Sequence, residues 1–216
     1  MTHPLLNAIA ESFPLTELDC RTFACMEVNG FSCRIRRFAA EGLGNVSLMA
    51  ATGPGGQMQM DVLIAAPTDR DMPLLSLDRV KAAGSDTLIV EMYDTLLGTP
   101  DLTAMDEAVQ AAAPLRDKDP GVHWYDPIKL PQSLCKAGKA EECAAFDAAS
   151  EKYLRQYAAA ARGAGTCDAA AKRKKTAAYV EGLLSRGGPA TDLFLTGIGA
   201  RKTAELFTKV LFATEE

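Results

Sequence analysis

Hydrophobic and β-branched residues dominate the first half of the chain, in short runs separated by turn residues. Between residues 20 and 95 these runs recur roughly every 10–14 residues. That spacing is typical of antiparallel strands joined by short turns. We therefore predict six strands, near residues 20–28, 31–39, 45–52, 57–65, 73–81 and 86–93.

The second half of the chain has helical periodicity instead. Phe146, Ala149, Tyr153 and Tyr157 recur at the spacing of one helix face. Thr99 followed by Pro100 has the residue types of a helix start. A short helix is predicted at residues 3–13, before the strands, and further helices near 168–186, 189–197 and 200–212 follow a Pro- and Asp-rich connection at 114–136.

Strands followed by helices predict a single α+β domain over residues 1–216. In this fold a central antiparallel sheet of about six or seven strands is flanked by helices. Neither an internal repeat nor a long linker divides the chain.

Composition narrows the functional classes. Hydrophobic residues make up 48% of the chain, enough for a full core, and the net charge of −5 argues against nucleic-acid binding. No apolar run approaches the ~18 residues of a membrane span. Six cysteines without a Cys-x-x-Cys pair, and two histidines, disfavour a metal site and fit free thiols. We predict a soluble, cytoplasmic protein with neither a nucleic acid nor a membrane as partner.

Two aspartates interrupt strands that otherwise have a buried pattern. Asp61 lies within residues 57–64 and Asp78 within residues 73–80. Burial of an unpaired carboxylate costs several kcal/mol, so these residues either face water at an edge or have a task. If the two strands pair, both acids could point into one crevice, where burial or mutual repulsion raises one pKa towards neutrality. Whether Glu91 on the next strand joins them is left open.

Other motifs have structural interpretations. Gly53-Pro54-Gly55-Gly56 lies between two predicted strands without a following Lys-Ser/Thr, which indicates a hairpin turn rather than a nucleotide site. His123 stands among aromatic residues in a Pro-rich loop, and we interpret it as structural. The chain has no matched Ser/His/Asp set for hydrolysis.

Basic residues form two groups on this acidic chain. One is Lys172-Arg173-Lys174-Lys175, and the other is Arg34, Arg36 and Arg37. Each group could be a solvated surface, or could dock an acidic partner or the carboxylates of a substrate.

The segment from Asp71 to Val80, with Ala83-Gly84-Ser85 and Thr87 to Val90 after it, resembles the ferredoxin-dependent bilin reductases and the related red chlorophyll catabolite reductases. The shared pattern is a Pro-apolar-apolar strand carrying an acid, a Gly-containing turn and an apolar strand. The resemblance extends over most of residues 45–212 and includes the Trp124 loop, the helix of Tyr153 and Tyr157, and a C-terminal part with Tyr179, Asp192 to Leu195, Gly199 and Ala204 to Phe212.

This resemblance implies an α/β/α sandwich and a bilin oxidoreductase. The implied reaction reduces a linear tetrapyrrole such as biliverdin IXα by sequential electron and proton transfers through a bilin radical, as in phycobilin biosynthesis. Ferredoxin would supply the electrons, the protein would hold no metal or flavin of its own, and a haem oxygenase would act upstream.

The resemblance also implies roles for particular residues. Asp78 falls on the family's central catalytic acid, and Asp61 falls near the position of a catalytic His in some members. The family's second Glu falls near Leu48, and its C-terminal acid or Asn falls near Gly187, so both are missing here. The implied substrate-binding residues are Arg34, Arg36, Arg37, Ser76 and Asp192, and the implied ferredoxin-binding residues are Lys172, Arg173, Lys174 and Lys175.

Two other hypotheses stay open. The missing acids favour a bilin-binding protein of the same fold without turnover. Alternatively, the protein is an interaction module in which Asp61 and Asp78 form local salt bridges.

Overall fold

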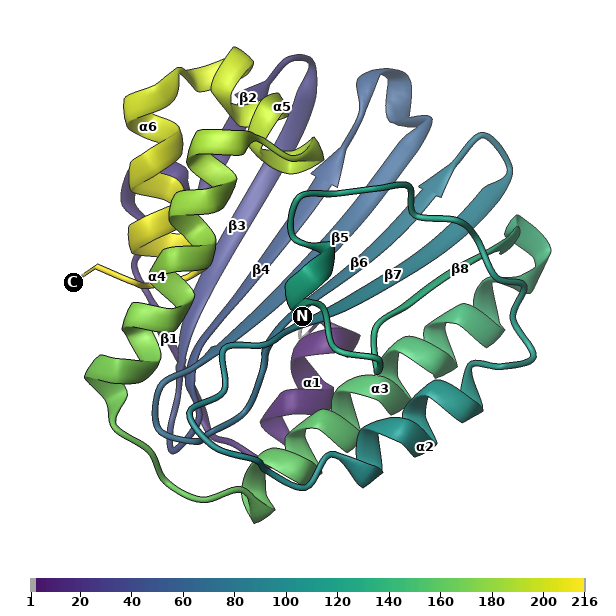
Figure 1. The fold of residues 1–216 in the computed structure, drawn as a ribbon. Coiled ribbons are helices and arrows are strands. Elements are labelled where there is room, and N and C mark those ends of the chain that lie inside the picture. Colours follow the sequence, from purple (N-terminus) through teal and green to yellow (C-terminus); the bar gives the residue numbers. More distant parts are fainter. Residues whose placement is uncertain (1–2, 216) are drawn as a thin grey trace.

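One antiparallel sheet forms the centre of the protein (Figure 1). The structure, a computed structural model, describes residues 3–215. From β3 to β8 each strand pairs with the one before it, whereas β1 and β2 both pair with β3 at one edge. The strands are β1 (Leu15–Leu18), β2 (Cys25–Val28), β3 (Phe31–Ala40), β4 (Gly44–Thr52), β5 (Met58–Pro67), β6 (Leu74–Ala82), β7 (Ser85–Tyr93) and β8 (Leu134–Lys139).

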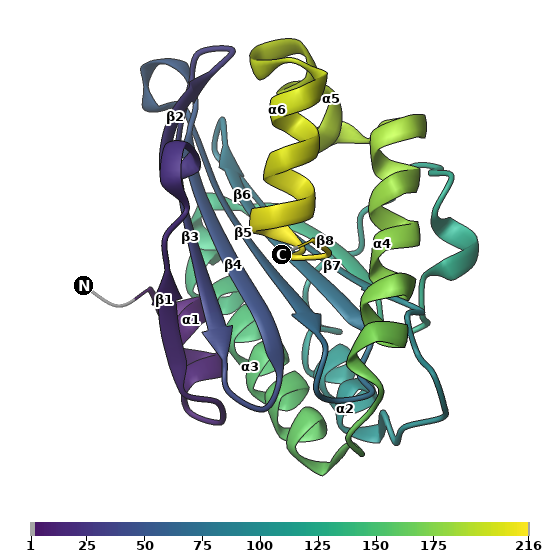
Figure 2. The same cartoon turned by 90° about the vertical axis from the view of Figure 1, so that its left-hand side faces the viewer.

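Helices cover both faces of this sheet (Figure 2). Helices α1, α2 and α3 pack on one face, and α4, α5, α6 and a π-helical turn pack on the other. The predicted α+β sandwich with a central antiparallel sheet is therefore confirmed. The helices are α1 (Pro4–Ala10), α2 (Thr103–Ala111), α3 (Cys143–Gly163), α4 (Ala169–Arg186), α5 (Pro189–Ile198), α6 (Ala200–Glu205) and the π-helical turn (Leu206–Leu211).

Strand alternation divides the core into two layers. Leu63, Leu77 and Val90 point to the α1–α3 face, where they join one cluster of buried residues. Ile64 and Leu74 point to the α4–α6 face, where they join the other. Side chains with even numbers on β5 and β6 therefore face α4 and α5, and this parity decides which polar residues can meet there.

Several predicted boundaries differ from the structure. Strand β8 was expected to be part of the irregular connection, and β1 was not predicted. Helix α2 begins at Thr103 rather than at Thr99, because the Asp101 carboxylate accepts hydrogen bonds from the backbone N–H and the hydroxyl of Thr103. The predicted hairpin turn is confirmed, since Pro54–Gly56 forms a short 3-10 turn between β4 and β5.

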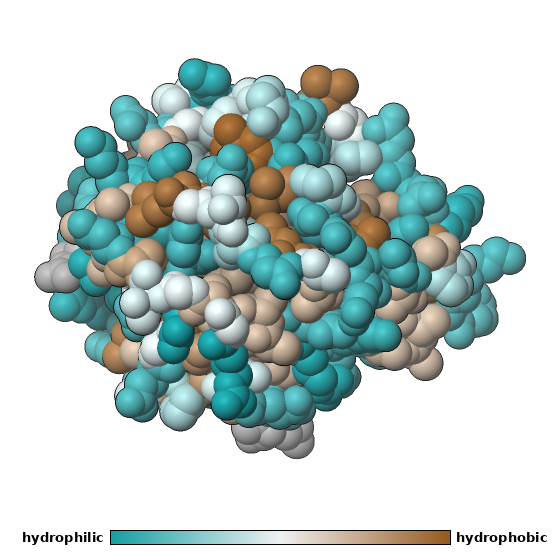
Figure 3. Space-filling model, turned by 60° about the horizontal axis from the view of Figure 1, so that its bottom comes forward, coloured by the Kyte–Doolittle hydropathy of each residue, from teal (hydrophilic) through white to brown (hydrophobic). Residues whose placement is uncertain are grey.

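The surface around α2 and α3 is mostly hydrophilic, with hydrophobic residues in small separate groups (Figure 3). Small scattered groups of this kind are normal on a protein surface. Within residues 3–215, no helix combines the length and the apolar composition needed to cross a membrane.

Candidate functional site

A cavity of about 450 Å³ lies between the sheet and the α4–α5 layer. Its volume is within the range of small-molecule sites. Most of its lining is apolar, and four methionine and valine side chains of β4 and β5 contribute to it. These are Met49, Met58, Met60 and Val62.

Two carboxylates, Asp78 and Glu91, are part of this apolar lining. Asp78 lies opposite Val62 on β5 and Ile89 on β7, and Glu91 lies opposite Ser76. Asp78 and Glu91 are thus diagonal neighbours on one face of adjacent strands. The Ser76 hydroxyl donates a hydrogen bond of 3.3 Å to Asp78 Oδ1.

Burial raises the pKa of Asp78 to about 7, and the negative charge of Glu91 contributes to the increase. The hydrogen bond from Ser76 acts in the opposite direction. Asp78 is therefore a carboxyl group that can carry a proton near neutral pH, which is what a general acid requires.

Glu91 is fixed by two neighbours. Its Oε2 accepts a hydrogen bond of 2.5 Å from the Tyr93 hydroxyl, and Lys129 Nζ lies 3.4 Å from its Oε1. The ring of Tyr93 contacts Tyr179 of α4, with 4.2 Å between ring centroids. Burial raises the pKa of both tyrosines well above its ordinary value, so they stay neutral hydrogen-bonding groups.

The loop between α2 and β8 closes one side of the cavity. Trp124 fastens it to α4: the indole donates to the carbonyl of Gly187 over 2.9 Å, and Gly182 leaves room for the ring. A Cβ at Gly182 would lie 2.2 Å from the indole. This contact brings His123 and Tyr125 into the lining, with their rings stacked 4.9 Å apart.

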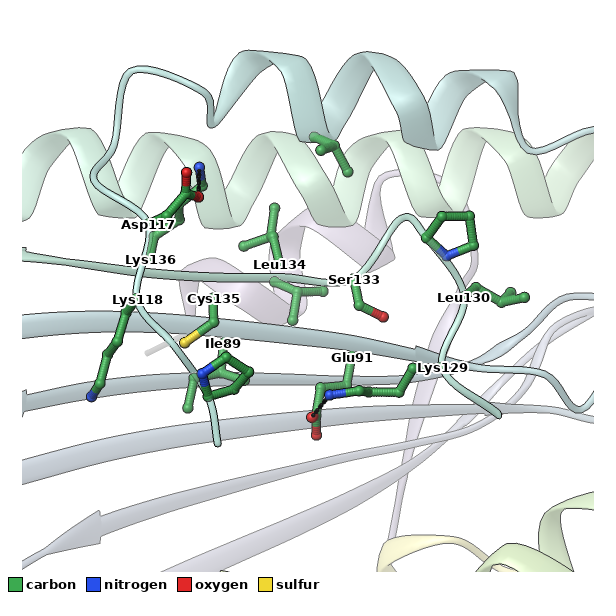
Figure 4. Close-up of a pocket in the computed structure, with 14 residues that line it drawn as sticks. Ile89, Glu91, Asp117, Lys118, Lys129, Leu130, Ser133, Leu134, Cys135 and Lys136 are labelled. Carbon is green, nitrogen blue, oxygen red and sulfur yellow. Dashed lines mark hydrogen bonds and ion pairs between the residues drawn. The ribbon is translucent and has the colours of Figure 1, made fainter. Parts of the chain in front are cut away.

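A second hollow of about 400 Å³ lies on the other side of Glu91, beside β7 and β8 (Figure 4). Glu91, Ile89 and Pro120 line both cavities. Figure 4 shows Lys129 reaching the Glu91 carboxylate from the loop. The Glu91–Lys129 pair therefore stands between the two spaces. Over the described part of the chain, no group of His, Cys, Asp and Glu side chains is arranged to hold a metal ion.

Comparison with known proteins finds likeness among solved structures and not among sequences. No protein-family model and no curated protein matches the sequence. Among solved structures, the chain is similar to phytochromobilin synthase from tomato, in complex with biliverdin. The two proteins share a similar fold. The TM-score is 0.79 at 12% sequence identity, and the alignment covers 97% of this chain and 80% of that one.

The fold shared with phytochromobilin synthase does not bring Asp61 into the cavity. Asp61 pairs across strands with Arg79, and its side chain points to the α1 face, where His3 Nε2 lies 3.4 Å away. The prediction that Asp61 and Asp78 share one crevice is wrong, because they have opposite parity in the paired strands. Val62 holds the position beside Asp78.

Of the predicted substrate-binding residues, only Ser76 lines the cavity. Arg36 binds Glu17 at 2.7 Å on the opposite face, and Arg34 is exposed on that face too. Arg37 donates to Asn45 Oδ1 over 2.7 Å, outside the lining. Asp192 is exposed, with its carboxylate near the backbone of Gly188. The structure therefore places these four residues outside the cavity lining.

The basic residues at 172–175 of α4 differ in their exposure to solvent. Lys172 is fully buried, 2.9 Å from Asp71 Oδ1, and donates to the carbonyl of Thr95 over 2.8 Å. It is a structural residue and cannot contact a partner. Lys174 and Lys175 are exposed, whereas Arg173 is half-buried.

Sequence reasoning missed several polar residues of the lining, among them Glu91, His123 and Thr191. The position of Glu91 was left open, although strand alternation places it on the same face as Ile89 and Tyr93. His123 was interpreted as structural, and no local pattern reveals its position. Only the contact of Trp124 with α4 brings this loop over the sheet.

The raised pKa of Asp78 predicts a pH-dependent stability. The unfolded chain releases this proton near pH 3.8, whereas the folded protein keeps it to about pH 7. Ionised Asp78 therefore disfavours the folded state increasingly from about pH 4 to pH 7, and constantly above that. We expect Asp78→Asn to be more stable than the parent by about 4 kcal/mol at pH 8 and equally stable at pH 3.5.

Urea unfolding at pH 3.5, 5, 6.5 and 8 measures this difference. A gap between the two proteins that does not change with pH would show that Asp78 ionises normally.

Proposed function

We propose that the protein reduces a linear tetrapyrrole of the biliverdin type, with electrons delivered one at a time by ferredoxin. The observation that carries the proposal is Asp78, a carboxyl group with a pKa of about 7 in the apolar cavity. The fold supports it, because phytochromobilin synthase is a ferredoxin-dependent bilin reductase whose structure holds biliverdin.

The residues of the cavity fit the needs of this reaction. Reduction of one bilin double bond consumes two electrons and two protons, and each electron must be followed or preceded by a proton on the tetrapyrrole. Neutral Asp78 is the proton donor, and burial, with a further contribution from the charge of Glu91, keeps it protonated near pH 7. The methionines and aromatic rings exclude water from the pigment.

His123 is the second proton-exchanging group in this proposal. Its backbone N–H donates to Asp126 Oδ2 over 2.8 Å, and its Nδ1 lies 3.9 Å from Asp126 Oδ1. Lys129 links Asp126, at 2.8 Å, to Glu91. A chain of polar side chains thus runs from His123 through Asp126 and Lys129 to Glu91, which lines the cavity beside Asp78.

The proposed function is tested by an anaerobic absorption series. The purified protein is mixed with biliverdin IXα, and spectra are recorded before and after addition of ferredoxin and its reducing system. A bound-bilin spectrum that converts to a blue-shifted product supports a reductase. A bound spectrum that never changes identifies a binding protein without turnover, and the absence of any bound spectrum contradicts a tetrapyrrole function.

The electron donor is expected to dock near the exposed lysines of α4. Lys175 lies one helical turn from Tyr179, whose ring is in the cavity lining, so an acidic iron–sulfur protein bound here would be near the pigment. We expect Lys174→Glu with Lys175→Glu to slow electron transfer from ferredoxin about tenfold at low salt. Stopped-flow spectroscopy of the bilin over a range of ionic strength measures this rate.

The matched control is Lys152→Glu, which reverses an exposed charge on α3, across the sheet. It should leave the rate unchanged, and bilin affinity should be unaffected in every variant. An equal effect of the α3 and α4 reversals would show that net charge matters and not a docking surface.

A further inference from the structure

The first turn of α5 forms one wall of the cavity. Gly188, Pro189, Ala190 and Thr191 all line it. An α-helix leaves its first backbone N–H groups without intrahelical partners, and here no side chain caps them. The N–H groups of Ala190 and Thr191 are therefore donors at the cavity wall, at the positive end of a ten-residue helix.

Thr191 adds a side-chain donor at the same place. It is 1% exposed, and its hydroxyl oxygen is buried without a hydrogen-bond partner. A helical threonine commonly donates to the carbonyl four residues earlier. That residue is Gly187, which precedes the helix and whose carbonyl already accepts the indole N–H of Trp124. An unpaired buried hydroxyl is costly, so a ligand oxygen here would relieve a real penalty.

The charges of the cavity single out this turn. The lining includes Asp78 and Glu91, whereas none of its described residues is Lys or Arg. The arginines Arg34, Arg36 and Arg37 lie outside it. Apart from His123, the lining therefore offers an acidic substrate one group of donors with positive potential, the first turn of α5.

We propose that the first turn of α5 and the Thr191 hydroxyl bind a carboxylate of the substrate. This inference rests on the proposed function, since a biliverdin-type bilin carries two propionates. The bound carboxylate would accept hydrogen bonds from the Thr191 hydroxyl and from the backbone N–H groups of Ala190 and Thr191. Helix N-termini bind carboxylates in this way. The contact holds one end of the pigment away from the two acids of the sheet.

The negative charge of Asp192 disfavours a carboxylate at this site, so substitution of Asp192 can test the proposal. Its Oδ1 lies 3.5 Å from the backbone nitrogen of Gly188, which places a negative charge beside the same turn. Removal of that charge should strengthen carboxylate binding without changing the cavity lining, because Asp192 is exposed and outside it.

The test compares biliverdin with its dimethyl ester by absorption titration, without any reductant. We expect the parent protein to prefer the diacid. Thr191→Val, which keeps the shape of the side chain, should weaken diacid binding about tenfold and leave ester binding unchanged. Thr191→Ser should restore the preference, and Asp192→Asn should increase it.

The outcomes separate this inference from the proposed function. An equal loss of diacid and ester in Thr191→Val, with no rescue by serine, would mean that Thr191 only shapes the fold. An undiminished preference for the diacid in Thr191→Val would also overturn the inference, while the bilin function would stand. If the parent protein binds neither pigment, both the inference and the proposed function are wrong.

Discussion

Replacing Asp78 with asparagine should slow the proposed bilin reduction about a thousandfold while the bilin stays bound. The amide has nearly the size of the carboxyl group, so the cavity keeps its shape, but it has no proton to give near pH 7. Loss of a positioned general acid commonly costs 10²–10⁴ in rate, by order of magnitude. After the first electron the pigment should therefore remain as a radical, which electron paramagnetic resonance and stopped-flow absorption can both detect.

Glu91→Gln is the companion variant. The charge of Glu91 raises the pKa of Asp78, so its removal should lower that pKa. Asp78 then stays protonated over a smaller range of pH. The rate of bilin reduction should therefore begin to fall at a lower pH than in the parent. In Ser76→Ala the rate should begin to fall at a higher pH than in the parent, because the Ser76 hydrogen bond lowers the pKa of Asp78.

Undiminished turnover in Asp78→Asn would remove Asp78 from the mechanism.

The position of Asp78 could be predicted because strand alternation and a family resemblance agreed on it. The position of Asp61 could not. Its strand was identified, and its pairing with the strand of Asp78 was expected, yet the register places Val62 beside Asp78. A shift of one residue moves every side chain to the other face. The turn between β5 and β6 sets that register, and no local pattern states it.

The basic run on α4 shows a second limit of sequence reasoning. Lys172 and Lys174 belong to the same charged run, but the helix turns one inwards and the other outwards. Lys172 can be buried because its ammonium pairs with Asp71, which lies in the segment between β5 and β6, 101 residues earlier. His123 reaches the cavity for a similar reason, through a contact of Trp124 with a helix far along the chain. Long-range partners of this kind leave no trace in residue spacing.

Lys172→Met should destabilise the protein by about 3 kcal/mol. The ammonium lies between Asp71 and the carbonyl of Thr95, and so ties α4 to the segments at the ends of β5 and β7. Burial lowers the pKa of Lys172, although Asp71 counteracts it. Breaking a buried ion pair by removing one partner commonly costs 3–5 kcal/mol, because the other charge is left uncompensated. Urea unfolding at pH 7 measures the loss.

The Asp71 carboxylate accepts hydrogen bonds from other donors besides Lys172, and these donors decide what a double variant should show. Its carboxylate also accepts the backbone N–H groups of Leu97 at 2.9 Å and Gly98 at 2.7 Å. Asp71→Asn combined with Lys172→Met should therefore recover part of the loss, since it removes the stranded charge and keeps one backbone contact. Lys174→Met and Lys175→Met should each change stability by less than about 0.5 kcal/mol, as exposed residues do. If Lys172→Met cost no more than these two, the Lys172–Asp71 pair would not hold α4 against the sheet.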